Sequence, residues 1–92
     1  MGKNDASKII KQRRLKMRSS CGEVDKLIGE RIRTLRNIRG LTSGQLGKEI
    51  GVSHQQVTKY ERAMNKIAAS KLLLVAQVLS KDISWFYKEG ND

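Results

Sequence analysis

The chain has 92 residues, enough for one small domain and too few for two. It contains no proline, and it lacks the β-branched runs and turn signals that a β-sandwich or barrel needs. The formal net charge of +10 favours a polyanionic partner, with nucleic acid ahead of an anionic membrane surface.

Cysteine and histidine each occur once, which excludes an intrachain disulfide and a zinc site built within the chain. No apolar run reaches about 18 residues, so we expect no membrane span. The basic N-terminus lacks a continuous apolar segment, which argues against a secretory signal. The lone histidine has no carboxylate or nucleophile at useful spacing, and no glycine-rich phosphate loop occurs. We therefore expect a cytoplasmic protein that is not an enzyme and has no cofactor.

Residues 1–22 form a basic N-terminal segment that carries +6 of the total charge of +10. Its apolar residues form no stripe at helical spacing. Two interpretations remain open: a flexible, solvated arm, or an arm that contacts the phosphates or the minor groove of DNA. Gly22 is the expected boundary between this arm and a domain of residues 23–92.

A first helix is expected over residues 23–39, and Gly40 is expected to end it in the left-handed conformation. Its apolar residues recur at spacings of four, three and three, which predicts a single buried stripe. The stripe consists of Ile28, Ile32, Leu35 and Ile38. The arginines of this helix are expected on its solvated face, and Glu61 is expected to pair with either Arg31 or Arg36.

Residues 41–62 are expected to form two short helices, 43–50 and 54–62, joined by a sharp turn at Gly51. Gly51 suits a positive φ, and Gly47 lets the backbones approach each other at the turn. Ser53 is the expected N-cap of the second helix, and Thr42 or Ser43 that of the first. Gly44 has no evident structural role. These features are typical of a helix-turn-helix.

The second of these helices carries an outward set of polar side chains. The set consists of His54, Gln55, Gln56 and Lys59. Side chains of these types form hydrogen bonds with base edges, and glutamine can bind adenine with two bonds. The pattern therefore predicts DNA binding through the major groove.

The C-terminal third is expected to add a fourth helix over residues 71–80, capped by Ser70, and a last short helix that starts at Asp82 or Ser84. In the fourth helix the expected buried positions are Leu72, Leu73, Val75, Ala76 and Leu79. In the last helix we expect Ile83 and Phe86 to point inward and Trp85 and Tyr87 to lie at the surface. Trp85 and Tyr87 are the candidates for a dimer contact.

Residues 24–87 resemble the Cro/CI-type phage-repressor family of helix-turn-helix domains, also called the XRE family. The matching text is GERIRTLRNIRGLTSGQLGKEIGVSHQQVTKYER, followed by LLLVAQVL and ISWFY. The resemblance implies an all-α fold, a compact five-helix DNA-binding domain. It also implies a transcriptional regulator, most often a repressor, that binds a palindromic operator as a homodimer.

The resemblance also implies roles for individual residues. By position, the base-contacting residues are His54, Gln55 and Lys59, with Gln56 as a helper. The phosphate-contacting residues are Thr42, Ser43, Thr58, Arg62 and Lys66. Two departures concern the loop before the fourth helix: Ala63 stands where the family often has glycine, and Ala68-Ala69 where it often has proline. The loop is therefore expected to run differently.

Two other functional classes are compatible with the sequence beside the DNA-binding regulator. One is an antitoxin-like protein-interaction module that also binds DNA. The other is a basic binder of RNA or of a membrane surface that acts mainly through residues 1–22.

Overall fold

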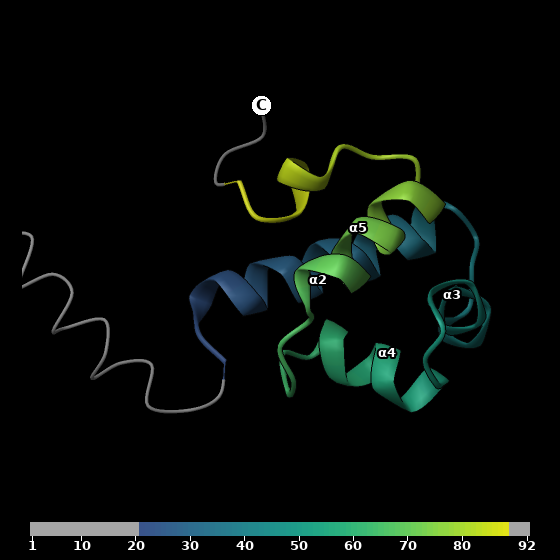
Figure 1. Ribbon diagram of the computed structural model, residues 1–92, viewed down its shortest axis with the longest axis horizontal. Helices are drawn as coiled ribbons and strands as arrows, with labels where there is room; N and C mark the ends of the chain where they lie inside the picture. Colours follow the sequence, from purple (N-terminus) through teal and green to yellow (C-terminus); the bar gives the residue numbers. More distant parts are fainter. Residues whose placement is uncertain (1–20, 89–92) are drawn as a thin grey trace, which may run out of the picture.

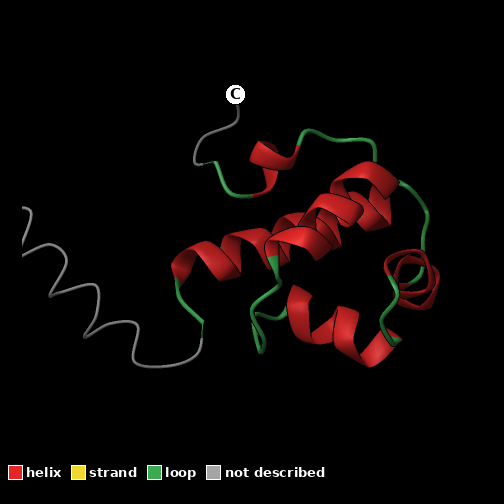
Figure 2. Cartoon of the chain, in the orientation of Figure 1, coloured by secondary structure: helices red, strands yellow, loops and turns green. Residues whose placement is uncertain are grey.

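The computed structural model describes residues 21–88. The expectations for the N-terminal arm therefore lie outside the described residues, except at Cys21 and Gly22, which are both buried. The described part is all-helical, with four α-helices and one 3-10 helix (Figures 1 and 2). In chain order these are α2 (Glu23–Ile38), α3 (Ser43–Ile50), α4 (His54–Glu61), α5 (Ala69–Val78) and η1 (Ile83–Phe86). The division of the chain at Gly22 stays a prediction.

The prediction of five α-helices is wrong, because the C-terminal element is a single turn of 3-10 helix. The Asp82 carboxylate accepts a hydrogen bond from the Ser84 N–H at 3.2 Å and so caps the turn. The Tyr87 N–H donates to the Ser84 carbonyl at 3.2 Å in the i→i+3 pattern. The segment is one turn long, and short pieces of this length commonly adopt the 3-10 form.

The long helix α2 runs through the molecule, packing against α4 and η1, while α3 packs against α4 and α5 (Figure 1). The core between them is apolar. It consists of Ile32, Leu35, Leu46, Ile50, Val57, Leu72, Val75, Ala76, Leu79 and Phe86. Each fully buried Leu, Ile, Val or Phe side chain contributes about 1.5–3 kcal/mol relative to exposure. Phe86 is fully buried, so η1 closes the core from the C-terminal side.

Two of the expected core positions are wrong. Ile38 is 68% exposed and is the last residue of α2. Leu73 is 46% exposed, since it lies about a quarter of a turn around the helix from the buried residues of α5. Leu72, Val75, Ala76 and Leu79 are buried as expected.

The start and end of α5 also differ from expectation. The helix begins at Ala69 after Ala68, which caps it without a side-chain hydrogen bond, so Ser70 is not the N-cap. It ends at Val78 instead of residue 80, with Ser80 at a φ of 55° in the left-handed region. The Arg39 guanidinium donates to the Leu79 carbonyl at 2.8 Å, which satisfies a carbonyl at this end.

Arg31 and Arg36 of α2 are half-buried and make polar contacts within the fold, which corrects the expectation for these two, whereas Arg33 is exposed as expected. Arg31 donates to the carbonyls of Trp85 and Lys88, and its guanidinium lies 5.3 Å from the centre of the Trp85 ring. Trp85 also meets Phe86 edge-on at 5.1 Å. Trp85 is therefore half-buried, while Tyr87 is exposed as expected.

The loop after α4 takes a left-handed turn at Ala63, with a φ of 56°. The Ala63 N–H donates to the Tyr60 carbonyl at 3.1 Å and the Met64 N–H to the Lys59 carbonyl at 2.8 Å, which is the Schellman pattern. Glycine adopts this conformation more readily than alanine does, and the expected difference in the path of the loop stays a prediction.

Candidate nucleic-acid interface

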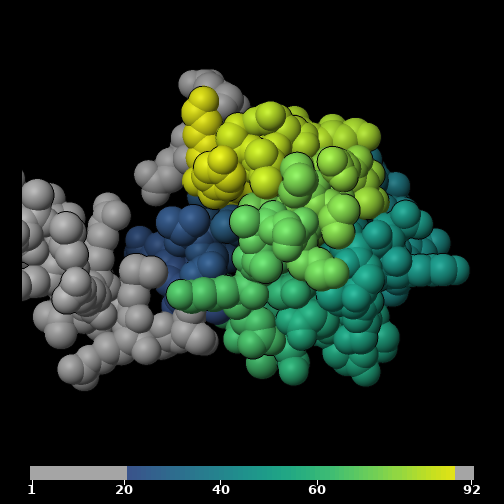
Figure 3. Space-filling model, in the orientation of Figure 1, coloured from purple at the N-terminus to yellow at the C-terminus, as the bar shows by residue number. Residues whose placement is uncertain are grey.

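The turn between α3 and α4 brings two backbones into close contact, as expected from its glycines. Gly51 has a φ of 79°, and a Cβ added at Gly47 would lie 2.6 Å from the Val52 carbonyl oxygen. The two helices are therefore held at a fixed angle by backbone contact. In the space-filling view, the teal residues of α3 and α4 form one continuous surface on the side away from η1 (Figure 3).

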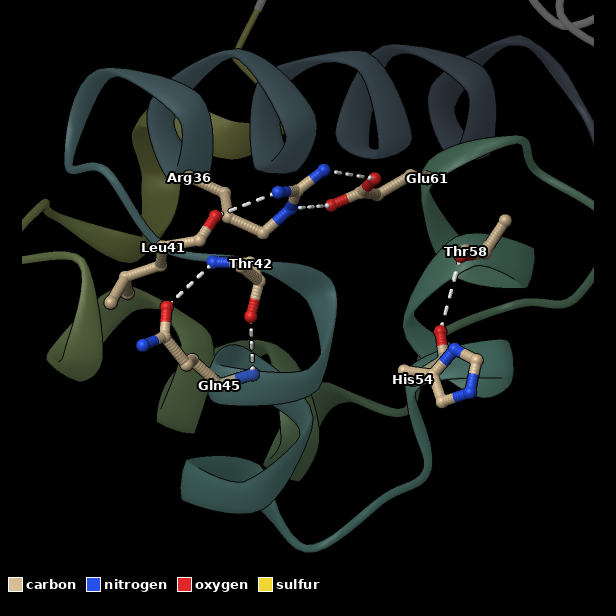
Figure 4. A network of polar contacts seen from close by, with 7 residues as sticks. All are labelled: Arg36, Leu41, Thr42, Gln45, His54, Thr58 and Glu61. Carbon is tan, nitrogen blue, oxygen red and sulfur yellow. Dashed lines mark hydrogen bonds and ion pairs between the residues drawn. The ribbon is translucent and has the colours of Figure 1, made fainter.

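Local hydrogen bonds fix where both helices start. Thr42 Oγ1 accepts from the Gln45 N–H at 3.0 Å, and Gln45 Oε1 accepts from the Thr42 N–H at 2.8 Å (Figure 4). Ser53 Oγ accepts from the Gln56 N–H at 3.1 Å. These bonds identify Thr42 as the N-cap of α3 and confirm Ser53 as the N-cap of α4.

The predicted base-contacting side chains lie on the outer side of α4. His54, Gln55 and Lys59 are exposed and Gln56 is half-buried, whereas Val57 on the inner side is fully buried. Gln55 and Lys59 are four residues apart and so lie one above the other on the same face. Gln56 Nε2 donates a hydrogen bond to Asn65 Oδ1 at 3.4 Å. The other three side chains of the set make no side-chain hydrogen bond to the described residues; they are His54, Gln55 and Lys59.

The predicted phosphate-contacting side chains differ in their exposure. Thr42, Arg62 and Lys66 are exposed, and Ser43 and Thr58 are half-buried. The Thr58 hydroxyl donates to the His54 carbonyl at 3.1 Å (Figure 4), so its one proton is engaged and a phosphate contact requires the side chain to rotate. The Thr42 hydroxyl acts only as an acceptor within the described fold, so its proton is available to an anion.

Arg36 connects the end of α4 to the start of α3 (Figure 4). Its Nε and one terminal nitrogen donate to the two carboxylate oxygens of Glu61 at 2.6 and 3.0 Å, and the other terminal nitrogen donates to the Leu41 carbonyl at 2.7 Å. The hydrogen bond to Glu61 raises the pKa of Arg36 above its ordinary value. Of the two partners considered for Glu61, the structure identifies Arg36.

Gly29 lets α4 lie directly against α2. A Cβ added at Gly29 would lie 2.5 Å from each of the carbonyl oxygens of Tyr60 and Glu61. Any side chain there would push the end of α4 away from α2, so the orientation of α4 depends on this glycine as well as on Arg36.

Two polar residues of this surface were not among the predicted site residues. Gln45 caps α3 through the Thr42-x-x-Gln45 pattern, which is a recognisable capping-box signature in the sequence. Asn65 contacts Gln56 from the loop after α4, and no sequence pattern indicates that contact because it depends on the left-handed turn at Ala63.

The described part of the chain offers little to other kinds of site. Residues 21–88 contain no group of three or more His, Cys, Asp or Glu side chains that could hold a metal ion. Within the same range, no helix has the length and apolar character needed to cross a membrane.

Comparison with known sequences gives a consistent result. The family model described as "Helix-turn-helix" matches residues 32–86. An HTH-type transcriptional regulator of Rickettsia prowazekii is 41% identical over 66 residues, which cover 72% of this chain and 51% of the relative. One of Sinorhizobium medicae is 35% identical over 67 residues, covering 73% and 48% respectively. The chain therefore spans about half the length of these curated relatives.

Solved structures share the fold. The P22 c2 repressor, crystallised in complex with a synthetic operator, superposes with a TM-score of 0.64 and 28% identity, over 68% of this chain and 96% of that one. The restriction-modification controller protein C.AhdI of Aeromonas hydrophila superposes with a TM-score of 0.65 and 24% identity, over 68% of this chain and 96% of that one. At this identity the similarity supports the fold and nothing further.

Proposed function

The chain belongs to the helix-turn-helix family, and from this premise we propose that it is a transcriptional regulator that binds double-stranded DNA in a sequence-specific way. In this proposal α4 enters the major groove and its outer side chains contact base edges. The observation that carries it is the outer face of α4, where His54, Gln55 and Lys59 are exposed and make no side-chain hydrogen bond within the described fold.

The contacts divide into two groups with different consequences. Thr42, Arg62 and Lys66 bind phosphates and set the register of the protein on the duplex, which adds affinity on every sequence. Ser43 and Thr58 contribute to this group, Thr58 after rotation of its hydroxyl. The start of α3 suits an anion because the dipole of the helix is positive at that end.

The second group supplies sequence preference. A glutamine that binds adenine with two hydrogen bonds discriminates against other bases by about 1–3 kcal/mol. The exposure of Gln55 on the outer face supports this role, with His54, Lys59 and Gln56 beside it. Occupancy of the operator excludes polymerase or another factor, which is the action of a repressor.

We also propose that the regulator acts as a homodimer on a palindromic operator, with half-site centres about 10–11 bp apart. Exposed apolar side chains away from α4 support this part. Leu73 and Leu74 of α5 are exposed, and so is Tyr87 after η1. Apolar surface of this kind is available for a second copy to cover.

Selection of bound duplexes from a random pool tests both parts of the proposal. We expect a palindromic motif, and we expect Gln55→Ala to lose preference for that motif while binding to unrelated duplexes persists. Equal loss on all sequences would show that Gln55 does not contact a base. Binding that plain polyanions or RNA compete away equally well would favour a nonspecific basic binder instead.

A further inference from the structure

We propose that Asn65 determines sequence preference, although it lies outside the two helices of the motif, because it fixes the orientation of the Gln56 amide. This inference rests on the proposed binding of DNA by α4. The contact that carries it is the hydrogen bond from Gln56 Nε2 to Asn65 Oδ1, at 3.4 Å, between a residue of α4 and one of the loop that follows.

The backbone around Asn65 is held in place independently of this contact. The N–H groups of Met64 and Asn65 both point at the Lys59 carbonyl, at 2.8 and 3.4 Å. The left-handed turn at Ala63 makes this possible by reversing the chain after α4. A non-glycine residue in this conformation costs about 1–2 kcal/mol in general, and strain of this kind is often retained where it positions a functional group.

Gln56 is in turn restrained at its backbone, since its N–H donates to Ser53 Oγ at 3.1 Å. The side chain is half-buried, whereas Gln55 beside it is exposed. Both ends of the Gln56–Asn65 contact therefore start from anchored backbone, and the contact can hold the amide in one of its two orientations before DNA arrives.

The orientation has a chemical consequence. With Nε2 directed at Asn65, Oε1 occupies the other branch of the planar amide and is presented as an acceptor. The second Nε2 proton remains available. Adenine offers an N6 donor and an N7 acceptor in the major groove and matches both groups, and cytosine offers an N4 donor. Guanine and thymine present only acceptors at these positions, so they are disfavoured opposite Gln56.

Asn65 therefore acts through Gln56 as a positioning residue, and its effect must vanish when Gln56 is absent. The test uses Q56A, N65A and the double variant in the full chain. The first step identifies the base pair of the selected operator at which Q56A abolishes the sequence preference. The affinity of each variant is then measured on that operator and on the three operators that carry the other base pairs at this position. We expect N65A to reduce the adenine preference there about five- to tenfold, the effect of about one hydrogen bond, and to change nothing further in the Q56A background.

Two controls separate this role from others. N65D keeps an acceptor oxygen at the same place, so it should retain the base preference while its added charge weakens binding to every duplex. N37A removes an exposed asparagine of α2 and should change neither affinity nor preference.

Several results would overturn the inference. A preference that survives N65A, or an N65A effect that persists in the Q56A background, means that Asn65 does not act through Gln56. Uniform loss on all four operators identifies Asn65 as a phosphate contact. A wild-type chain with no sequence preference would instead overturn the proposed function, and the inference with it.

Discussion

Replacement of Arg36 by methionine should be among the most damaging single changes in the chain. The guanidinium satisfies both oxygens of the Glu61 carboxylate and the Leu41 carbonyl. The side chains of Arg36 and Glu61 are only 11% and 5% exposed. Methionine fills similar volume but leaves the carboxylate buried without its cation. Removal of one partner of a buried ion pair costs about 3–5 kcal/mol.

This loss is large against the total stability of a small domain, which is about 5–15 kcal/mol. We expect R36M to lower the urea midpoint strongly, with far-UV circular dichroism as the measurement. The double variant R36M/E61M should recover most of the loss, because a buried pair can be exchanged for apolar side chains at little cost. If R36M lowered the free energy of unfolding by less than about 1 kcal/mol, the reasoning from a buried ion pair would be refuted. A double variant less stable than R36M would refute it as well.

The same pair determines how stability responds to pH. The hydrogen bond to Glu61 raises the pKa of Arg36 in the folded state above its ordinary value. A raised folded-state pKa means that the stabilisation is fully present below the ordinary arginine pKa, which lies far above neutral pH, and is lost only as the pH rises through the folded-state pKa. The difference in stability between wild type and R36M should therefore not shrink through titration of Arg36 between neutral pH and about pH 10.

Three further changes test other parts of the fold and the interface. G47A should destabilise the protein by about 1–3 kcal/mol, because the new methyl group would lie 2.6 Å from the backbone oxygen of Val52; an unchanged thermal midpoint would contradict the close approach. A63G should raise the midpoint, since it relieves about 1 kcal/mol of strain at a φ of 56°, whereas the control A69G in the first turn of α5 should lower it. Deletion of residues 1–20, which keeps the buried Cys21 and Gly22, should lower DNA affinity and flatten its salt dependence by a slope of about 0.9 for each phosphate that the arm neutralises; an unchanged slope would mean that the arm does not bind phosphates.

The sequence predicted α3 and α4 well because their ends are set by local interactions. Thr42, Ser53 and Gly51 determine where the helices start and turn, and the observed bounds Ser43–Ile50 and His54–Glu61 agree with expectation to within one residue. Caps and left-handed glycines act over three or four residues, so they can be recognised without knowledge of the tertiary fold.

Features that depend on packing were harder to predict. The start of α5 carries no capping side chain, so no local signal marked it. The partners of Arg31 and Arg39 are backbone carbonyls more than 35 positions away, and charge pattern alone could not distinguish them from solvated arginines. The sequence-derived roles of the residues on α4 stay predictions.

The exposure of the outer face of α4 has a consequence for how this protein could diverge. His54, Gln55 and Lys59 are exposed and make no side-chain hydrogen bonds within the described fold, while Val57 and Glu61 on the inner side hold the helix in place. Variation at the three outer positions is therefore nearly neutral for folding. A combinatorial library at residues 54, 55 and 59 should retain cooperative unfolding in most members and still yield new operator preferences, whereas a change at position 56 also removes the hydrogen bond to Asn65.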